Sequence, residues 1–165
     1  FNTTTDTLRL APVLAWIRHL LMLMKRRGCS YVDVGCAMSE GAPGLLLAAK
    51  VLRFDGLCAE LHGTDVVWPD TAFARDMLRT HRILVYASQP VLRPLPRSYD
   101  VILLANVIRH LTSDLQRKLL SNLAASLTED GMLFINWRFD ARHNPCLCLK
   151  RKANRMVLHA EGNLI

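Results

Sequence analysis

Five polar residues, each in or just after an apolar run, are the side chains of this chain best placed to bind a polar ligand together. They are Asp33, Asp65, Asn106 and the pair Ser88-Gln89. Runs rich in Val, Ile and Leu are typical of buried parallel strands, whose carboxyl ends meet along one edge of a sheet. Because a carboxylate can accept two hydroxyl donors, such an edge suits a ligand with neighbouring hydroxyl groups.

His110 is the side chain near this edge best suited to act as a general base, because the unperturbed pKa of histidine lies close to neutrality. Arg109, Asp140 and His143 are expected near the same mouth. His110 is therefore one candidate catalytic residue, and Asn106, which is expected near the same mouth, is the second. A histidine in the run Arg-His-Leu on a short helix also fits plain packing or solvation, and both interpretations stay open.

The stretch from Tyr31 to Gly41 joins an apolar run to a helical pattern through small residues. The run ends at Gly35, and the helical pattern opens after Pro43. A glycine lets the backbone approach a ligand closely, and the following helix offers free amide groups. Strand, small-residue turn and helix are the opening of a doubly wound nucleotide-binding fold. An ordinary strand–helix connection looks the same, so that alternative is kept.

Strand and helix patterns alternate along the rest of the chain, and they predict its elements. An apolar stripe predicts a first helix from Pro12 that stops at Gly28. Further helices are expected from Pro43 to about Arg53, from a cap at Asp70 through Arg79, and from a capping box at Ser113 and Gln116 to Gly131. Strands are expected at 30–34, 58–66, 83–87, 99–105 and 132–137, with a final hairpin of 146–150 and 156–159.

This order predicts an α/β fold, a Rossmann-like doubly wound sheet that is mostly parallel, with a C-terminal antiparallel hairpin and helices on both faces. We expect one domain over residues 1–165, with a helical lead-in at 1–28 and the Rossmann-like core at 29–165. The sequence starts at Phe1 rather than at methionine, so a longer parent protein is left open.

The composition favours a folded domain in a reducing compartment. Of the 165 residues, 51% are hydrophobic and 21% are charged, which excludes a disordered or fibrous chain. Five cysteines form no disulfide-scaffold pattern, so we expect a cytoplasmic location. The apolar segment 20–24 is bracketed by basic residues too closely for a membrane span. Cys146 and Cys148 have no second ligand pair at zinc spacing, so no metal is predicted.

With these motifs in view, the chain resembles the class I S-adenosylmethionine (SAM)-dependent methyltransferases from about Tyr31 to its final hairpin. The most specific part is Ser98-Tyr99-Asp100-Val101-Ile102-Leu103-Leu104-Ala105-Asn106-Val107-Ile108-Arg109-His110-Leu111, with Glu129-Asp130-Gly131-Met132-Leu133-Phe134-Ile135 after the Leu-rich helix. Locally, Asn106-Val107-Ile108 and the Gln116-Arg117 helix are similar to the chemotaxis-receptor glutamate methyltransferases. The extra substrate-recognition elements of those enzymes are missing from this sequence.

The resemblance implies SAM as cofactor and assigns contacts to it position by position. Asp33, Gly35, Cys36 and Ala37 fall in motif I, which wraps the methionyl part of the cofactor. Asp65 falls where an acidic residue accepts both ribose hydroxyls, and Val66 follows it. Ser88 and Gln89 fall where the family binds the adenine, and Asn106 falls beside the reactive methyl. Ala37 and Ser39 stand where the family has the second and third glycines of motif I. Their side chains, that of serine above all, leave less room for close approach between the backbone and a cofactor.

Two functions follow as expectations. The first is a methyltransferase that acts on RNA, a protein or a small molecule, and the second is a degenerate member of the fold that only binds. A formal charge of +7 and a basic carboxyl-terminal third fit either RNA, an acidic protein surface or a solvated rim. The basic residues are Arg138, Arg142, Lys150, Arg151, Lys152 and Arg155.

Overall fold

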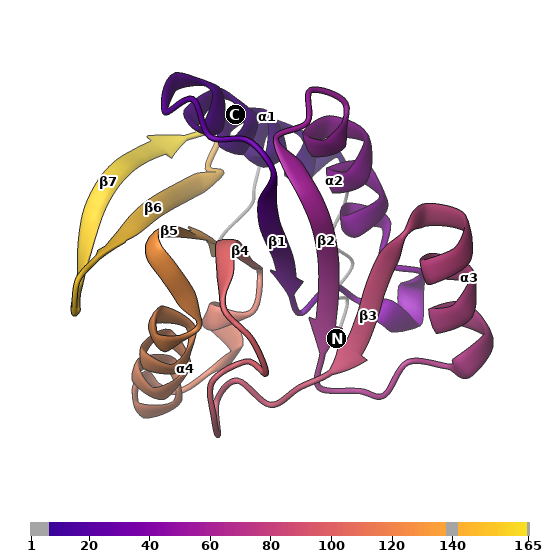
Figure 1. Cartoon of the computed structure of the whole chain (residues 1–165). Helices are drawn as coiled ribbons and strands as arrows, with labels where there is room; N and C mark the ends of the chain where they lie inside the picture. The colour runs from indigo at the N-terminus through magenta and orange to yellow at the C-terminus, as the bar shows by residue number, and fades with distance from the viewer. Residues whose placement is uncertain (1–6, 138–141, 165) are drawn as a thin grey trace.

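The computed structural model describes residues 7–137 and 142–164, and within them seven strands form one sheet (Figure 1). The strand order is β3-β2-β1-β4-β5-β6-β7. The strands are β1 (Cys29–Val34), β2 (Cys58–Asp65), β3 (Ile83–Ala87), β4 (Tyr99–Ala105), β5 (Leu127–Asn136), β6 (Pro145–Lys152) and β7 (Arg155–Asn163). Strands β1 to β5 pair in parallel, whereas β6 and β7 are antiparallel to their neighbours. Arg138 and Asp140, named above, lie outside the described residues.

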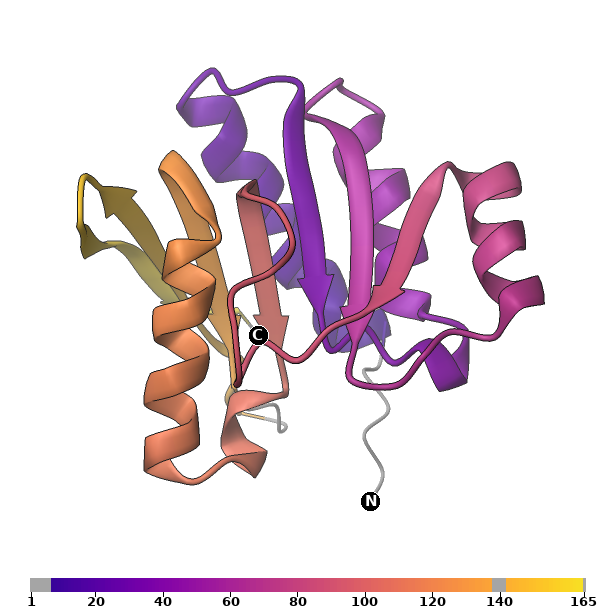
Figure 2. The same cartoon turned by 60° about the horizontal axis from the view of Figure 1, so that its bottom comes forward.

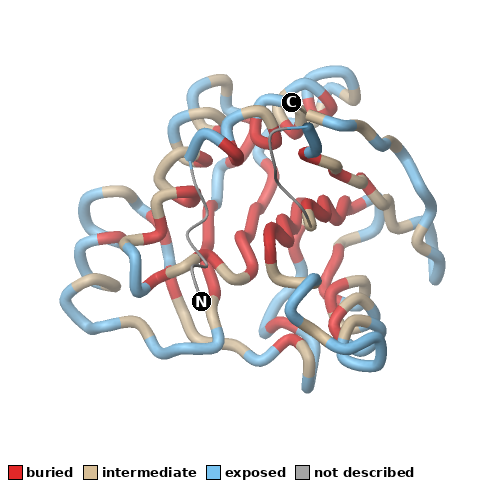
Figure 3. The backbone as a smooth tube through the Cα atoms, turned by 180° about the vertical axis from the view of Figure 1, so that it is seen from behind, coloured by how far each residue is buried: buried red, intermediate tan, exposed pale blue. Residues whose placement is uncertain are grey.

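Helices cover both faces of this sheet, as the alternation predicted (Figure 2). One face packs against α1 (Thr7–Leu23), α2 (Pro43–Arg53) and α3 (Thr71–His81), and the other against α4 (Ser113–Ala125). Because strand side chains alternate, Tyr31 of β1 joins the first core and its neighbour Val32 joins the second. Figure 3 shows the buried segments gathered in the middle of the molecule and the exposed segments at its outside. The predicted fold class is confirmed.

The sheet order reverses between β1 and β4, and this reversal decides where a ligand can bind. Strand β1 pairs with β2 on one side and with β4 on the other, so the connections leave β1 and β4 in opposite directions. A crevice opens at the carboxyl ends of the strands at such a switch point. We call this border, marked by Val34, Asp65, Ala87, Ala105 and Asn136, the carboxyl edge of the sheet.

The first helix begins earlier than the sequence predicted. It starts at Thr7 rather than at Pro12, and the proline lies inside it. Arg9 and Leu10, in the turn before the proline, are 4% and 1% exposed. Burial of this turn stabilises it and outweighs the loss of one backbone hydrogen bond at Pro12.

The capping box predicted for the fourth helix is wrong. Thr112 occupies the N-cap and makes no side-chain cap hydrogen bond. Instead of reaching back to an N-cap amide, Gln116 Nε2 donates to the carbonyl oxygens of Ile108 and Leu111, each at 3.0 Å. Its side chain therefore fastens the turn before the helix, which lies close to the carboxyl edge.

The end predicted for that helix is also wrong. The helix stops at Ala125 rather than at Gly131, and Leu127 begins β5 five residues earlier than expected. The repeat of leucine at every fourth residue extends through Leu127, but this residue pairs with Tyr99 of β4. Pairing in the sheet therefore overrides the helical period at this position.

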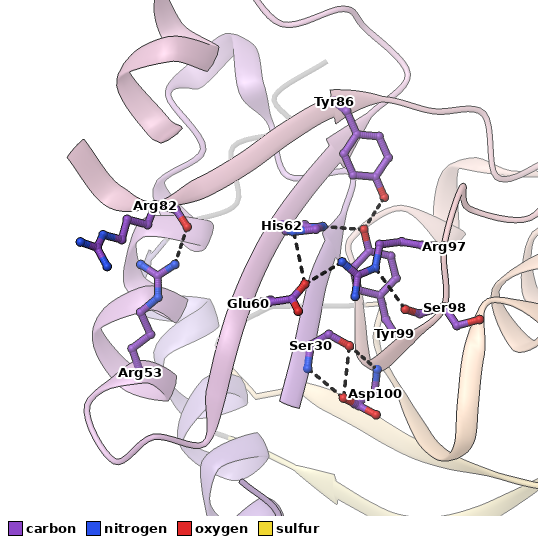
Figure 4. Close-up of polar contacts among 10 residues, drawn as sticks. All are labelled: Ser30, Arg53, Glu60, His62, Arg82, Tyr86, Arg97, Ser98, Tyr99 and Asp100. Carbon is purple, nitrogen blue, oxygen red and sulfur yellow. Dashed lines mark hydrogen bonds and ion pairs between the residues drawn. The ribbon is translucent and has the colours of Figure 1, made fainter. Parts of the chain in front are cut away.

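The face that carries α4 also holds a polar group of side chains that we call the tyrosine cluster: His62, Tyr86 and Tyr99 (Figure 4). Residues 88–98, all of them described, join β3 to β4 without a helix above this group. The Tyr99 hydroxyl lies 2.7 Å from His62 Nδ1 and 2.9 Å from the Tyr86 hydroxyl. The three side chains therefore link β2, β3 and β4 directly.

Candidate functional site

The turn after β1 brings the chain unusually close to the segment after β4. Gly35 has a φ of 77°, and a β-carbon on it would lie 2.4 Å from Val107 Cγ2. Ala37 and Ala42 flank the next turn with φ values of 55° and 47°, a left-handed conformation that strains residues other than glycine. The Gly35 amide donates to the Thr64 carbonyl at 2.8 Å, which fixes the turn against β2. Glycine is therefore required at position 35 by the positive φ and by the closeness of Val107.

Two adjoining cavities open at the carboxyl edge. The main cavity, of about 670 Å³, is lined by Gly35, Ala37, Ser39, Asp65, Val67, Ala105, Asn106, Val107, His110 and Leu111. The side cavity, of about 350 Å³, shares four of these residues and extends over Val66, Ser88 and Gln89. Together they have the size expected of a cofactor site. Eight of the ten residues that the sequence predicted for the site therefore line one or both of these cavities.

Asp65 stands where the two cavities meet. Its Oδ1 atom accepts the Val66 amide at 2.8 Å, which orients the carboxylate at the end of β2. The carboxylate lines both cavities. An ionised carboxylate has acceptor capacity beyond one amide, so Asp65 can receive ligand hydroxyl groups as well.

The side cavity is mostly apolar, with a polar border from the end of β3. Val34, Val66, Val91, Leu92 and Leu119 supply apolar walls. Ser88 is held at the border because its amide donates to the Asp65 carbonyl at 2.9 Å and its hydroxyl oxygen receives the Thr64 hydroxyl at 2.7 Å. A flat heteroaromatic ring with polar edges matches this combination of walls and border.

Asn106 lines the main cavity and carries a buried side-chain acceptor. The residue is 6% exposed, has a φ of 62° and donates its amide to the Asn136 carbonyl at 2.7 Å. Its Oδ1 atom is buried and has no hydrogen-bond partner among the described residues. Because an unpaired buried acceptor is costly, a ligand that donates to Asn106 Oδ1 is favoured.

Two predicted cofactor residues, Asp33 and Cys36, lie behind the cavities rather than on their walls. Asp33 is 4% exposed, and burial, followed by the charge of Asp65, raises the pKa of its carboxyl to about 7. Cys36 is 5% exposed, and burial followed by the charges of Asp33 and Asp65 raises the pKa of its thiol well above the usual range. Their placement indicates support of the turn, whereas direct contact with a ligand stays a prediction.

His110 lines the main cavity, but one of its ring nitrogens is already engaged. Its Nε2 atom accepts a hydrogen bond from Arg109 Nε at 3.3 Å, which in the neutral ring leaves the proton on Nδ1. A general base needs a free lone pair directed at the acceptor. Direct contact of His110 or Asn106 with the reacting groups therefore stays a prediction.

Sequence reasoning missed a buried group behind Asn106, which we call the amide hub: Arg9, Asn136 and Asn144. Arg9 Nε donates to Asn136 Oδ1 at 2.8 Å, and Asn136 Nδ2 donates to Asn144 Oδ1 at 2.8 Å. Asn144 Nδ2 closes the ring on the Arg9 carbonyl at 3.3 Å. The position of Asn136 at a strand end was a usable signal, but nothing local pointed to Arg9, which is 127 residues away.

The basic carboxyl-terminal third is partly neutralised by the chain itself. Lys150 Nζ lies 3.4 Å from Asp130 Oδ1, and the Arg151 guanidinium donates to the carbonyls of Leu127 and Ala153. Lys152 and Arg155 are exposed at the hairpin turn. Phosphate binding by this rim stays a prediction.

The described residues contain no group of three or more His, Cys, Asp or Glu side chains arranged to hold a metal ion. Cys146 and Cys148 are buried on β6, and burial raises the pKa of each thiol to about 12. Among the same residues, no helix is both long enough and apolar enough to cross a membrane.

Solved structures with the same fold are SAM-dependent methyltransferases. One is the 1,6-didemethyltoxoflavin-N1-methyltransferase of Burkholderia thailandensis, solved with S-adenosylhomocysteine, with a TM-score of 0.60, 17% identity, and coverage of 93% of this chain and 62% of that one. A SAM-dependent methyltransferase of Clostridium acetobutylicum has a TM-score of 0.60, 11% identity and coverage of 98% and 76%. A TehB-like enzyme of Corynebacterium glutamicum has a TM-score of 0.52, 20% identity and coverage of 75% and 61%.

No family model and no curated protein matches the sequence. The chain spans about three fifths of the length of the first structures it matches. At these identities the matches show the fold, which is that of the class I SAM-dependent methyltransferases. They lend no support to the finer similarity to chemotaxis-receptor enzymes, which stays a prediction.

Proposed function

We propose that the chain is a SAM-dependent methyltransferase domain that binds its cofactor across the carboxyl edge of the sheet. The observation that carries the proposal is that one cavity brings together Gly35, Asp65 and Asn106 from the ends of three different strands. Structures with this fold have been solved with SAM or S-adenosylhomocysteine bound, which supports the choice of cofactor.

The residues present fit that cofactor in type and in place. Asp65 would accept the ribose hydroxyls, and the apolar side cavity would hold the adenine against Val66 with Ser88 and Gln89 at its polar edge. Gly35 lets the turn after β1 approach Val107, where a β-carbon would clash, and Asn106 Oδ1 would accept a donor from the ligand. The cofactor supplies an electrophilic methyl group, so the protein has to align an acceptor and exclude water.

A calorimetric titration with S-adenosylhomocysteine tests the proposal. We expect the wild type to bind and Asp65→Ala to bind at least about tenfold more weakly, since a carboxylate that receives hydroxyl donors is worth about 1.5 to 3 kcal/mol. Asp70→Ala is the matched control, because Asp70 caps α3 five residues further on and lines neither cavity. Equal affinity in the wild type and Asp65→Ala would remove Asp65 from the site.

The acceptor would reach the main cavity near Asn106 and His110, and RNA, a protein and a small molecule remain candidates. The net charge of +7 favours an anionic acceptor, and Arg109 beside His110 is an exposed basic residue. Lys152 and Arg155, by contrast, lie beyond the Met132 end of β5, away from the carboxyl edge. Five free and buried cysteines support a reducing compartment such as the cytoplasm.

A second candidate is a binding module that keeps the cofactor but transfers nothing. It is favoured by Ala37 and Ser39, which line the main cavity where the family has glycine, and by the engaged Nε2 atom of His110. Incubation with radiolabelled SAM and cell extract separates the two candidates. Label transferred to any macromolecule or metabolite supports the enzyme, whereas cofactor binding without transfer supports the module.

A further inference from the structure

The amide hub lies directly behind Asn106, which lines the main cavity and whose buried Oδ1 atom has no partner among the described residues. The Asn136 carbonyl accepts the Asn106 amide at 2.7 Å and also accepts Arg9 Nη2 at 3.4 Å. Arg9 Nε holds the other end of the same residue through Asn136 Oδ1. The Arg9 guanidinium therefore donates to both the side chain and the backbone of Asn136, the residue that supports Asn106.

Asn106 needs such support because its own conformation is strained. Its φ of 62° is left-handed, a region that asparagine visits more readily than most residues but still at a cost. A residue held there keeps its conformation only where the surroundings fix it. Its short hydrogen bond to Asn136 supplies that constraint from the neighbouring strand.

No ion pair among the described residues accounts for the burial of Arg9. The residue is 4% exposed, and within the described part of the chain no carboxylate lies at ion-pairing distance from it. Burial, and then the like charge of Arg109, lowers its pKa to about 10. A packing role alone would be met by an apolar side chain of the same length, so the donor geometry is the property that distinguishes arginine here.

The hub also closes on itself, which makes it rigid. Asn136 and Asn144 are both fully buried, and Asn144 Nδ2 donates to the carbonyls of Arg9 and of Leu164 beyond β7. Buried polar groups whose partners are all present hold one arrangement in preference to others. The first helix, the end of β5 and the start of β6 are thereby fixed behind the cavity.

From these contacts we infer that Arg9 is a positioning residue for the cofactor site, which acts through Asn136 on Asn106. This inference rests on the proposed function. Arg9 lines neither cavity, so its effect on ligand affinity must pass through the residue that does. Loss of Arg9 would let Asn106 leave the left-handed conformation that it holds in the wall of the main cavity.

A double-mutant cycle with S-adenosylhomocysteine as the probe tests this inference. We expect Arg9→Met and Asn106→Ala each to weaken binding about tenfold, or about 1.4 kcal/mol. The double variant should bind no more weakly than Asn106→Ala alone, within about twofold. If Arg9 acts only by positioning the Asn106 side chain, its loss has no further effect once that side chain is absent. An additive loss of about a hundredfold, or wild-type affinity in Arg9→Met, would overturn the inference.

Arg18→Met is the matched control on the same helix. Arg18 lies in the second half of α1, where its Nε atom donates to Asp55 Oδ2 at 2.8 Å, and it lines neither cavity. Its loss should lower the melting temperature and leave the affinity unchanged. If Arg18→Met weakens binding as much as Arg9→Met, the effect is general destabilisation and the inference fails.

Arg9→Lys keeps the test decisive if Arg9→Met does not fold. Lysine keeps the cation but cannot hold Asn136 Oδ1 and the Asn136 carbonyl with the same fork of donors. We expect about a threefold loss of affinity that disappears in the Asn106→Ala background; a loss that persists there contradicts the inference. Absence of binding by the wild type would reject the proposed function as well, whereas wild-type binding with no effect of Arg9 rejects only the inference.

Discussion

The carboxyl edge and the tyrosine cluster are both rich in polar side chains, but they differ in how completely these are satisfied. At the edge, Gly35, Ala37 and Asn106 have left-handed backbones, and Asn106 Oδ1 has no partner among the described residues. In the cluster, His62 and Tyr99 sit on regular strands and bond to each other. Strain and unpaired buried groups are typical of places where a ligand binds, so the edge is the candidate site and the cluster joins strands. The other unpaired group among the described residues is the Tyr31 hydroxyl in the core.

The largest effect should come from adding one carbon atom at the edge. Gly35→Ala places a β-carbon against Val107 and forces alanine to a φ of 77°. We therefore expect the free energy of unfolding to fall by about 2 to 4 kcal/mol and cofactor binding to become undetectable. Gly28→Ala is the control, because Gly28 has a φ of 62° with no atom within 4 Å of the added carbon. It should cost about 1 kcal/mol and spare binding. Chemical denaturation and calorimetry measure both, and similar losses in the two variants would contradict the role given to Val107.

Breaking each polar group in turn sharpens the comparison next. Asn136→Ala leaves Arg9 and Asn144 without their partner, and we expect a loss of about 3 kcal/mol in stability together with weaker binding of S-adenosylhomocysteine. Tyr99→Phe removes two hydrogen bonds of the tyrosine cluster, costs about 1 kcal/mol and leaves binding unchanged. Weakened binding in Tyr99→Phe would show that the cluster contributes to the site.

The two regions should also respond to pH with opposite signs. Burial raises the pKa of Asp33 to about 7, so the folded chain binds its proton more tightly and stability falls as pH rises from about 4 to 7. Burial, then Arg97, lowers the pKa of His62, so stability falls as pH drops below the ordinary histidine value of about 6.5.

Substitution separates these two titrations. Asp33→Asn should be more stable than the wild type above pH 7, by an amount on the order of a few kcal/mol, with the gain vanishing near pH 4. His62→Gln should remove the destabilisation on the acid side. Denaturation at a series of pH values measures both. A gain in Asp33→Asn that is independent of pH would show that the Asp33 carboxyl keeps its ordinary pKa.

The smallest effect should come from relieving strain at the edge. Ala37→Gly removes the cost of a left-handed alanine and should stabilise the chain by about 0.5 to 1 kcal/mol. Because Ala37 lines the main cavity, affinity for S-adenosylhomocysteine should rise about twofold to threefold. Ala42→Gly, with a similar φ but no place on the cavity walls, should gain stability without affinity. Equal affinities in the two variants would show that the strain at Ala37 does not affect ligand binding.

The sequence was sufficient for the elements whose patterns are local. The runs that became β3 and β4 were located to the residue, and Asp70 does cap α3 through the amides of Ala72 and Phe73. Leu127 was misassigned because its leucine spacing continues a helix while its pairing with Tyr99 belongs to the sheet. Local periodicity cannot reveal which of two such partners is stronger.

The positions of the candidate site residues were predictable where they follow strand ends and unpredictable where distant segments meet. Asp65 and Asn106 were expected at one edge because strands in this order share it, and both line the main cavity. Arg9 was not, because its partners are 127 and 135 residues away and it lies in a turn that a proline made unfavourable for a helix. A buried hydrogen-bond ring between distant segments leaves no periodic trace in the sequence.

A crystal structure of the chain with S-adenosylhomocysteine tests the central claim most directly. We predict that the ligand lies across Gly35, with its ribose hydroxyls within hydrogen-bond distance of the Asp65 carboxylate and its adenine in the side cavity. Asn106 Oδ1 should accept a donor from the methionyl end. A ligand bound elsewhere, or a ribose that does not contact Asp65, would contradict the account.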